Sequence, residues 1–199
     1  MRALIMAGGE GSRLNLGEKP LVTVAGIPMI AHVIRAFFLY GCEVVVVASK
    51  KTPMTQNWCR VTGVEYIPAG GGGYIEDMET AVSFLEEPGP LFVAVSDLPC
   101  LTPGIIRTVH DAYSQSGKDA CSVWVPVSLF RSPSSCVYVE KIGGQNATPA
   151  GVNILRGDMI GQPQDELQLL LKEPRLASNV NTREDLAFTD SYLRGHADR

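Results

Sequence analysis

Short apolar runs and helically spaced apolar residues follow one another along the chain. Four continuous apolar runs predict strands that are covered on both faces, because such strands show little alternation with polar residues. These runs lie at residues 3–7, 43–49, 91–96 and 121–127. Between them, apolar residues recur with the spacing of amphipathic helices. The predicted helices lie at residues 29–38, 54–61, 75–86 and 103–115, and a short strand is predicted at 64–67.

The last third of the chain has a less regular pattern. Residues 128–148 predict a loop or small hairpin, because serine, proline and glycine interrupt them. Beyond this segment the pattern predicts a helix at the end of the chain, where Thr182 and Asp185 form a loose capping box. The full set of elements predicted here is a strand at 150–156, a helix at 164–172, a strand at 175–180 and a helix at 182–193.

Strands that alternate with helices predict an α/β fold with a doubly wound, mostly parallel sheet. We expect one domain over residues 1–199, since no linker or repeat interrupts the pattern. Ligands of such sheets bind at the carboxyl ends of the strands. Four candidate segments directly follow predicted strands, so we expect them to face one crevice. They are residues 8–13, 49–52 and 70–73, and Asp97.

A glycine-rich loop with two nearby cations follows the first predicted strand. Glycines let a bare backbone approach a ligand and present its N–H groups, and Arg13 and Lys19 add positive charge. A polyphosphate suits such a loop best, and the alternative is a tight turn with charges on its surface. The loop reads Ala7-Gly8-Gly9-Glu10-Gly11-Ser12-Arg13, with Lys19-Pro20 beginning six residues beyond Arg13.

The spacing within this loop separates three classes of phosphate site. Leu14 stands where a dinucleotide-binding fingerprint needs a small residue. The Gly-Lys-Ser/Thr sequence of a Walker loop does not follow the glycines. The remaining pattern, G-G-x-G-S-R-L with K-P shortly after it, resembles the signature of nucleotidyltransferases that activate sugars and cofactors with a nucleoside triphosphate.

Asp97 is a candidate metal ligand, because a carboxylate at the end of a central strand can hold Mg²⁺ against a triphosphate. Its alternative role is to cap the turn that follows the strand. Asn181 could add an amide oxygen to the same metal shell, and its alternative role is that of an ordinary residue before a helix. The sequence therefore predicts an Mg²⁺ site formed by Asp97 and Asn181.

Composition and charge exclude several classes of partner. The net charge of −4 provides no global basic field for nucleic acid or anionic membrane, so local groups must hold any anionic substrate. No apolar run approaches membrane-spanning length. The five cysteines are scattered and lack metal-site spacing, which favours reduced thiols in a cytoplasmic protein. The sequence does not fix the oligomeric state, and a homodimer is compatible with it.

Five strings in order extend the resemblance to nearly the whole chain, roughly residues 1–190. They are GGEGSRL…EKPL, GGGYIEDM, VSDLPCL, TPAGVNIL and NVNTREDL. In this order they look like those of the archaeal GTP:adenosylcobinamide-phosphate guanylyltransferases, within the MobA-like superfamily. These enzymes act in the nucleotide-loop assembly of cobalamin. The first string and the Asp–Asn pair are shared with related transferases, whereas GYIED and TPAGVN point to the cobinamide branch.

This resemblance implies transfer of GMP from GTP to adenosylcobinamide phosphate with release of pyrophosphate. The attacking group is already a phosphomonoester, which is mostly dianionic at neutral pH, so no general base is needed. The resemblance assigns Lys19 to the α-phosphate, and Arg13 with the N–H groups of residues 8–12 to the departing phosphates. Mg²⁺ on Asp97 and Asn181 would stabilise the leaving group. The implied catalytic residues are Arg13, Lys19 and Asp97.

Guanine and the acceptor require further contacts. Guanine presents N–H donors, so its pocket needs acceptors. Glu76 and Asp77 are candidates, although acids also favour the first turn of a helix without any ligand. Tyr74 offers a packing surface beside Gly73. Gly151 and Asn153 are candidate acceptor-binding residues, and Gly151→Asp is predicted to impair transfer.

Two other functions remain open from the sequence. A transferase with the same fold could act on molybdopterin or on a sugar phosphate. A nucleotide sensor without catalytic activity could also retain the fold. Arg13, Lys19, Asp97 and Asn181 together argue against the sensor, because a binding module has no need of the metal pair.

Overall fold

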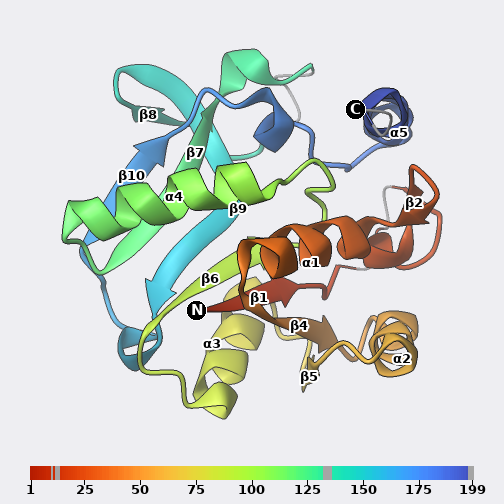
Figure 1. Cartoon of the computed structure of the whole chain (residues 1–199), viewed down its shortest axis with the longest axis horizontal. Helices are drawn as coiled ribbons and strands as arrows, with labels where there is room; N and C mark the ends of the chain where they lie inside the picture. The colour runs from red at the N-terminus through yellow and green to blue at the C-terminus, as the bar shows by residue number, and fades with distance from the viewer. Residues whose placement is uncertain (10, 12–13, 132–135, 197–199) are drawn as a thin grey trace.

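One central sheet organises the computed structural model of the chain (Figure 1). The structure describes residues 1–9, 11, 14–131 and 136–196. Neighbouring strands follow the order β10-β7-β9-β6-β1-β4-β5, and β8 pairs with β9 outside this row. The strands of this sheet are β1 (Arg2–Met6), β4 (Glu43–Ser49), β5 (Tyr66–Ala69), β6 (Pro90–Val95), β7 (Ala120–Pro126), β8 (Glu140–Ile142), β9 (Gln145–Arg156) and β10 (Glu166–Leu170).

The connections between these strands contain α-helices, short 3₁₀ helices and one small hairpin. The hairpin pairs β2 (Thr23–Val24) with β3 (Ile27–Pro28). The 3₁₀ helices are η1 (Lys19–Leu21), η2 (Val127–Leu129), η4 (Gly157–Met159) and η5 (Pro174–Ala177). The α-helices are α1 (Met29–Tyr40), α2 (Pro53–Thr62), α3 (Tyr74–Leu85), α4 (Pro103–Ser116) and α5 (Arg183–His196).

The sheet is mostly parallel and is covered by helices on both faces, which confirms the predicted doubly wound α/β fold. Strand β1 pairs in parallel with β4 and β6, β4 with β5, and β7 with β10. Strand β9 runs antiparallel to β6, β7 and β8. Along β1, Ala3 and Ile5 share a core with residues of α1 and α4, whereas Leu4 and Met6 pack with residues of α3. Because both faces of β1 are buried in this way, every residue of the strand after Arg2 is apolar.

Two elements of the last third differ from their prediction. Residues 164–172 were predicted as a helix, and the structure instead places β10 there as an edge strand beside β7. Leucines at 167, 170 and 171 match helical spacing, which is why the pattern is misleading. In the structure, Leu167 and Leu169 pack against the main core and Leu170 against Trp124 and its neighbours, as expected for a strand.

The strand predicted at 175–180 was also wrong, because η5 occupies its first half. Pro174 has no N–H to donate to a neighbouring strand, and the Glu173 side chain accepts from the Arg175 N–H at 3.1 Å. Leu176 is nevertheless fully buried in the main core. An apolar residue can thus be buried here without joining the sheet.

The segment predicted as a loop or hairpin at 128–148 contains both irregular and paired structure. It begins in η2 and includes β8, whose Glu140 and Ile142 pair with the start of β9. Strand β9 starts at Gln145, five residues before the predicted start at residue 150. The described residues after 135 therefore contain a hairpin, and those before 132 contain η2 and irregular structure.

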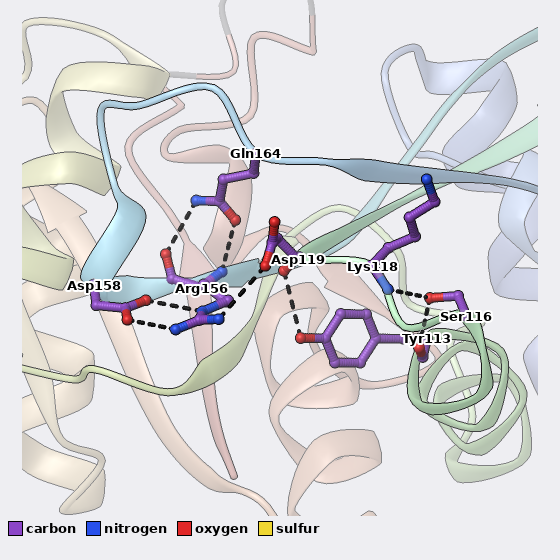
Figure 2. Close-up of polar contacts among 7 residues, drawn as sticks. All are labelled: Tyr113, Ser116, Lys118, Asp119, Arg156, Asp158 and Gln164. Carbon is purple, nitrogen blue, oxygen red and sulfur yellow. Dashed lines mark hydrogen bonds and ion pairs between the residues drawn. The ribbon is translucent and has the colours of Figure 1, made fainter.

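A polar network lies at the end of the sheet opposite the carboxyl ends of the parallel strands (Figure 2). The Arg156 guanidinium donates to Asp158 at 3.0 Å and contacts Asp119 at 3.5 Å. The Gln164 side chain bonds both backbone groups of Arg156: its amide oxygen accepts from the N–H at 2.9 Å, and its amide nitrogen donates to the carbonyl at 3.1 Å. Gln164 thereby anchors the chain just before β10.

We expect Gln164→Ala to lower the free energy of unfolding by about 1–2 kcal/mol, since it leaves two main-chain groups without their partner. Urea unfolding followed by circular dichroism measures this change. Gln162→Ala is the matched control, because the exposed Gln162 lies in the same connection. Equal effects of the two substitutions would contradict the anchoring role of Gln164.

Three smaller expectations, on the cysteines, on membrane-spanning segments and on the capping box, can be compared with the structure. The five cysteines are free, and four of them are buried. Within the described residues, no helix is both long and apolar enough to cross a lipid bilayer. At α5, the Thr182 hydroxyl accepts from the Asp185 N–H at 3.1 Å, and the Asp185 carboxylate accepts from the Thr182 N–H at 2.9 Å. The predicted capping box is therefore confirmed.

Candidate functional site

The carboxyl ends of β1, β4, β5 and β6 surround a cavity of about 290 Å³, which we call the strand-end cavity. The loops that were predicted to face one crevice contribute to it, as the topology of a doubly wound sheet requires. Its lining residues are Met6, Gly8, Gly9, Lys19, Lys51, Gly71, Gly73, Tyr74, Asp77, Val95, Ser96 and Asp97.

Lys19 and Asp97 of this cavity meet Asn181 at its edge, although the three residues are far apart in the sequence. The Lys19 ammonium donates to the Asp97 carboxylate and, at 2.8 Å, to the Asn181 side-chain oxygen. The Lys19 and Asp97 side chains are 17% and 14% exposed, so most of this ion pair is withdrawn from solvent. The Val180 N–H also donates to the Asp97 carbonyl at 3.2 Å, which holds the start of the α5 segment against β6.

The chemistry of this cluster fits a divalent cation. Asp97 Oδ1 is buried and has no hydrogen-bond partner among the described residues, so one carboxylate oxygen remains available. Asp97 and Asn181 offer oxygen ligands, which Mg²⁺ prefers. No group of three or more histidine, cysteine or acidic residues that could hold a metal ion occurs in the described part of the chain, either here or elsewhere. Mg²⁺ often takes one or two protein ligands and fills its shell with water and phosphate oxygens, so two ligands are sufficient.

Glu18 fixes the backbone next to Lys19, and sequence reasoning missed this role. Its carboxylate accepts from the N–H groups of Met54 and Thr55 and from the Thr55 hydroxyl, each at 2.7 Å. These groups lie in the first turn of α2, where backbone N–H groups lack helical partners and favour an anion. The available signal was an acid directly before Lys19-Pro20 and a second proline, Pro53, at the start of a helix.

The glycine-rich loop packs closely against η1. Gly11 has a φ of +68°, and a Cβ on it would lie 2.9 Å from the Lys19 Cβ, so glycine is required here both by conformation and by space. Gly8 and Gly9 line the strand-end cavity. The Ala7 N–H donates to the Val47 carbonyl at 2.8 Å and therefore serves the sheet. Glu10, Ser12 and Arg13 lie outside the described residues.

The residues at the start of α3 that were predicted to contact the nucleotide differ in whether they line the strand-end cavity. Asp77 is buried, and one carboxylate oxygen accepts from the Gly71 N–H at 2.8 Å, which holds the glycine cluster against the helix. Asp77 and Gly73 line the strand-end cavity, whereas Glu76 is exposed and does not line it. Of the two candidate acids, the geometry thus favours Asp77.

Tyr74 links this helix to β9. Burial of its hydroxyl end raises its pKa to about 12, and an interaction with the Asn153 side chain acts in the opposite direction. The residue as a whole is 40% exposed. Tyr74, expected at the nucleotide, and Asn153, expected at the acceptor, therefore meet at one place, and the phenol stays neutral at physiological pH.

Gly151 has a structural role that the sequence did not reveal. It has a φ of +76°, and a Cβ there would lie 2.6 Å from a methyl group of Val95, which lines the strand-end cavity. The missing side chain lets β9 approach the end of β6. The predicted effect of Gly151→Asp on transfer would therefore act first through the position of β6.

We expect Gly151→Ala to lower the free energy of unfolding by about 2–4 kcal/mol, because it combines a left-handed backbone with overpacking against Val95. Urea unfolding measures the loss. Gly144→Ala is the matched control: Gly144 has a φ of +80° and nothing within 4 Å of its would-be Cβ. If both variants lose the same free energy, contact with Val95 contributes nothing.

Lys51 and Ser96 also line the strand-end cavity. Lys51 belongs to the segment 49–52 that was predicted to face the crevice, whereas Ser96 was not singled out in the sequence. Lys51 follows β4, and its side chain lies beside Gly71, where a Cβ would come within 3.5 Å of it. A second lysine thus joins Lys19 at the rim. The cavity combines two cations, an available carboxylate oxygen and a glycine loop, which is the arrangement needed to bind a phosphorylated ligand and a metal.

Comparison with known proteins decides the family. A family model described as the MobA-like NTP transferase domain matches residues 3–145. The chain belongs to this family. The transferase is 29% identical, over 98% of both chains, to a Methanocaldococcus jannaschii protein named adenosylcobinamide-phosphate guanylyltransferase. It is 22% identical, over 94% of its own length and 93% of the relative's, to a Mycolicibacterium paratuberculosis protein named as a probable molybdenum cofactor guanylyltransferase.

Solved structures support the same fold. The transferase aligns with a CMP:2-keto-3-deoxy-manno-octonic acid synthetase in complex with CTP at a TM-score of 0.75, with 14% identity over 98% of both chains. The resemblance inferred from the five sequence strings is confirmed by the match to the archaeal relative. The transferase is therefore a nucleotidyltransferase enzyme.

Proposed function

We propose that the transferase moves GMP from GTP to adenosylcobinamide phosphate and releases pyrophosphate. The observation that carries this proposal is the meeting of Lys19, Asp97 and Asn181 at the edge of the strand-end cavity. The likeness to the Methanocaldococcus jannaschii relative over 98% of both chains supports the choice of acceptor.

The reaction forms one phosphorus–oxygen bond and breaks another. An oxygen of the acceptor phosphate attacks the α-phosphorus of GTP, and the bond from that phosphorus to the bridging oxygen breaks. The electron pair leaves with pyrophosphate, so no proton needs to be removed from the attacking dianion. The enzyme's task is then to position the two phosphates in line and to neutralise their charge.

Each residue of the cluster has a role in this reaction. Asp97 and Asn181 would hold Mg²⁺, which neutralises charge on the phosphates when bound. Lys19 would exchange its present hydrogen bonds for oxygens of the α-phosphate, where negative charge grows during transfer. Glu18 keeps the Lys19 backbone fixed during this change, because its carboxylate is held by the first turn of α2.

The remaining contacts concern the base and the departing phosphates. The second Asp77 oxygen would accept from guanine N–H groups, while the first stays with Gly71. Gly8, Gly9 and Gly11 would present backbone to the β- and γ-phosphates, together with Arg13. Tyr74 would support the base, and Gly151 and Asn153, which lie beside Val95 and Tyr74 of the strand-end cavity, would border the phosphate end of the acceptor.

Pyrophosphate release tests the proposal. The purified enzyme is mixed with Mg²⁺ and GTP, ATP, CTP or UTP, each with and without adenosylcobinamide phosphate. We expect release with GTP only when the corrinoid is present, together with a product of the mass of the GMP adduct. If the corrinoid gives no release, the same mixtures are tested with molybdopterin and with a sugar phosphate. Release with either would assign the acceptor to that class, and GTP binding without release in any mixture would favour a sensor.

A further inference from the structure

A second cavity, of about 250 Å³, lies beside α5, and we call it the α5 cavity. Its walls come from η2, the start of β9, η5 and α5. Much of the surface is apolar, with Leu129, Phe130, Pro149 and Phe188 among the lining residues. None of the reaction steps proposed above uses this space.

The α5 cavity adjoins the reaction centre through Asn181. Asn181 lines the α5 cavity, and its side-chain oxygen accepts from Lys19 at 2.8 Å. Lys19 and Asp97 in turn line the strand-end cavity. A ligand in the α5 cavity would therefore have its nearest end beside the point where the phosphates react.

Thr189 gives an independent sign that a ligand belongs there. Its side chain is completely buried, lines the α5 cavity, and has a hydroxyl without any hydrogen-bond partner among the described residues. A buried hydroxyl without a partner costs free energy, and such groups are rare unless a ligand or water satisfies them. A ligand with an amide or hydroxyl group would supply the missing bond.

The charged residues of the α5 cavity are largely occupied by structural contacts. The Asp185 carboxylate accepts from the N–H groups of Asn181 and Thr182, and Arg175 pairs with Glu173. The Arg131 guanidinium lies 4.3 Å from the centre of the Phe188 ring. Beside these charged groups the cavity presents apolar side chains and neutral amides and hydroxyls in comparable amounts, which suits a ligand that carries amide groups on an apolar framework.

We propose that the α5 cavity binds one amide-bearing edge of the acceptor's corrinoid, with Thr189 donating to or accepting from a side-chain amide of that edge. This inference rests on the proposed function, and it locates the acceptor on the α5 side of Asn181 while GTP occupies the strand-end cavity. A sugar phosphate would present many hydroxyls and favour free carboxylates, whereas Asp185 is committed to the start of α5.

Steady-state kinetics of two cavity variants test this assignment. Thr189→Val removes the hydroxyl and keeps the shape, so we expect the KM for adenosylcobinamide phosphate to rise about threefold to tenfold. The KM for GTP should be unchanged, and the Tm should not fall, because the variant removes a buried group without a partner. Ser178→Phe, which fills part of the cavity, should raise the acceptor KM by roughly tenfold or more.

Thr108→Val is the matched control, because the exposed Thr108 hydroxyl bonds the Gly104 carbonyl on α4, outside both cavities. If the wild type makes product and both cavity variants keep the wild-type acceptor KM, the assignment of the α5 cavity is overturned while the proposed function stands. Equal increases in both KM values would also overturn it. If the wild type makes no product with the corrinoid, the proposed function fails and this assignment fails with it.

Discussion

Lys19→Ala should lower kcat by about 10²–10³-fold and change the affinity for GTP by only a few fold. The reason is that a donor aimed at the α-phosphate contributes most when charge develops there during transfer. Steady-state kinetics give kcat, and titration with GTP in the absence of acceptor gives the binding constant. Similar losses in kcat and in GTP affinity would contradict a role in the transition state.

The matched control for this substitution is Lys118→Ala. Lys118 is exposed and pairs with Asp165 at 2.8 Å. It lies near the polar network of Figure 2, at the end of the sheet opposite the carboxyl ends of the parallel strands. It carries the same charge as Lys19 and does not line the strand-end cavity. Its loss should leave kcat within twofold or so of the wild type.

Asp97→Asn should reduce activity by roughly 10³-fold and make the residual rate depend on higher Mg²⁺ concentrations. The amide keeps the shape and can still accept from Lys19, but it removes the negative charge that attracts the cation. Measuring the rate across a range of Mg²⁺ concentrations separates weaker metal binding from slower chemistry. Weaker binding of Mn²⁺, followed by electron paramagnetic resonance, gives a second readout without turnover.

Asp111→Asn provides the control for Asp97→Asn, because Asp111 is exposed on α4 and lines neither cavity. It should show the wild-type dependence on Mg²⁺. An Asp97→Asn enzyme with the wild-type rate at every Mg²⁺ concentration would remove Asp97 from the proposed metal site.

Local patterns were enough to predict the main-sheet strands and the α-helices of the first two thirds of the chain, although η1 and the hairpin of β2 and β3 were not predicted. Apolar runs such as that at 43–49 are long and rich in β-branched residues, so they have no competing helical interpretation. Residues 164–172 were ambiguous, because the same leucines satisfy a helical and an extended spacing. Contacts with β7 and the hydrogen bonds from the Gln164 side chain to the Arg156 main chain decide this segment, and neither is visible in a local window.

The candidate site was predicted where it depends on topology and missed where it depends on side-chain contacts. Lys19, Asp97 and Asn181 could be anticipated, because strand ends converge and the resemblance marks these positions. The hydrogen bonds of Glu18 with the first turn of α2 depend on how η1 lies against this helix, which begins more than thirty residues later in the sequence. The close approach of Gly151 to Val95 likewise depends on the pairing of β9 with β6, which the sequence alone does not specify.

The bond from Lys19 to Asn181 spans 162 residues of sequence. During synthesis the ribosome delivers Lys19 and the first strands long before Asn181, which belongs to the last tenth of the chain. Contacts of such high sequence separation are costly to close, so they tend to form late. A nascent chain can therefore acquire much of its sheet while the proposed phosphate-transfer centre is still incomplete, and catalytic competence would come late in folding.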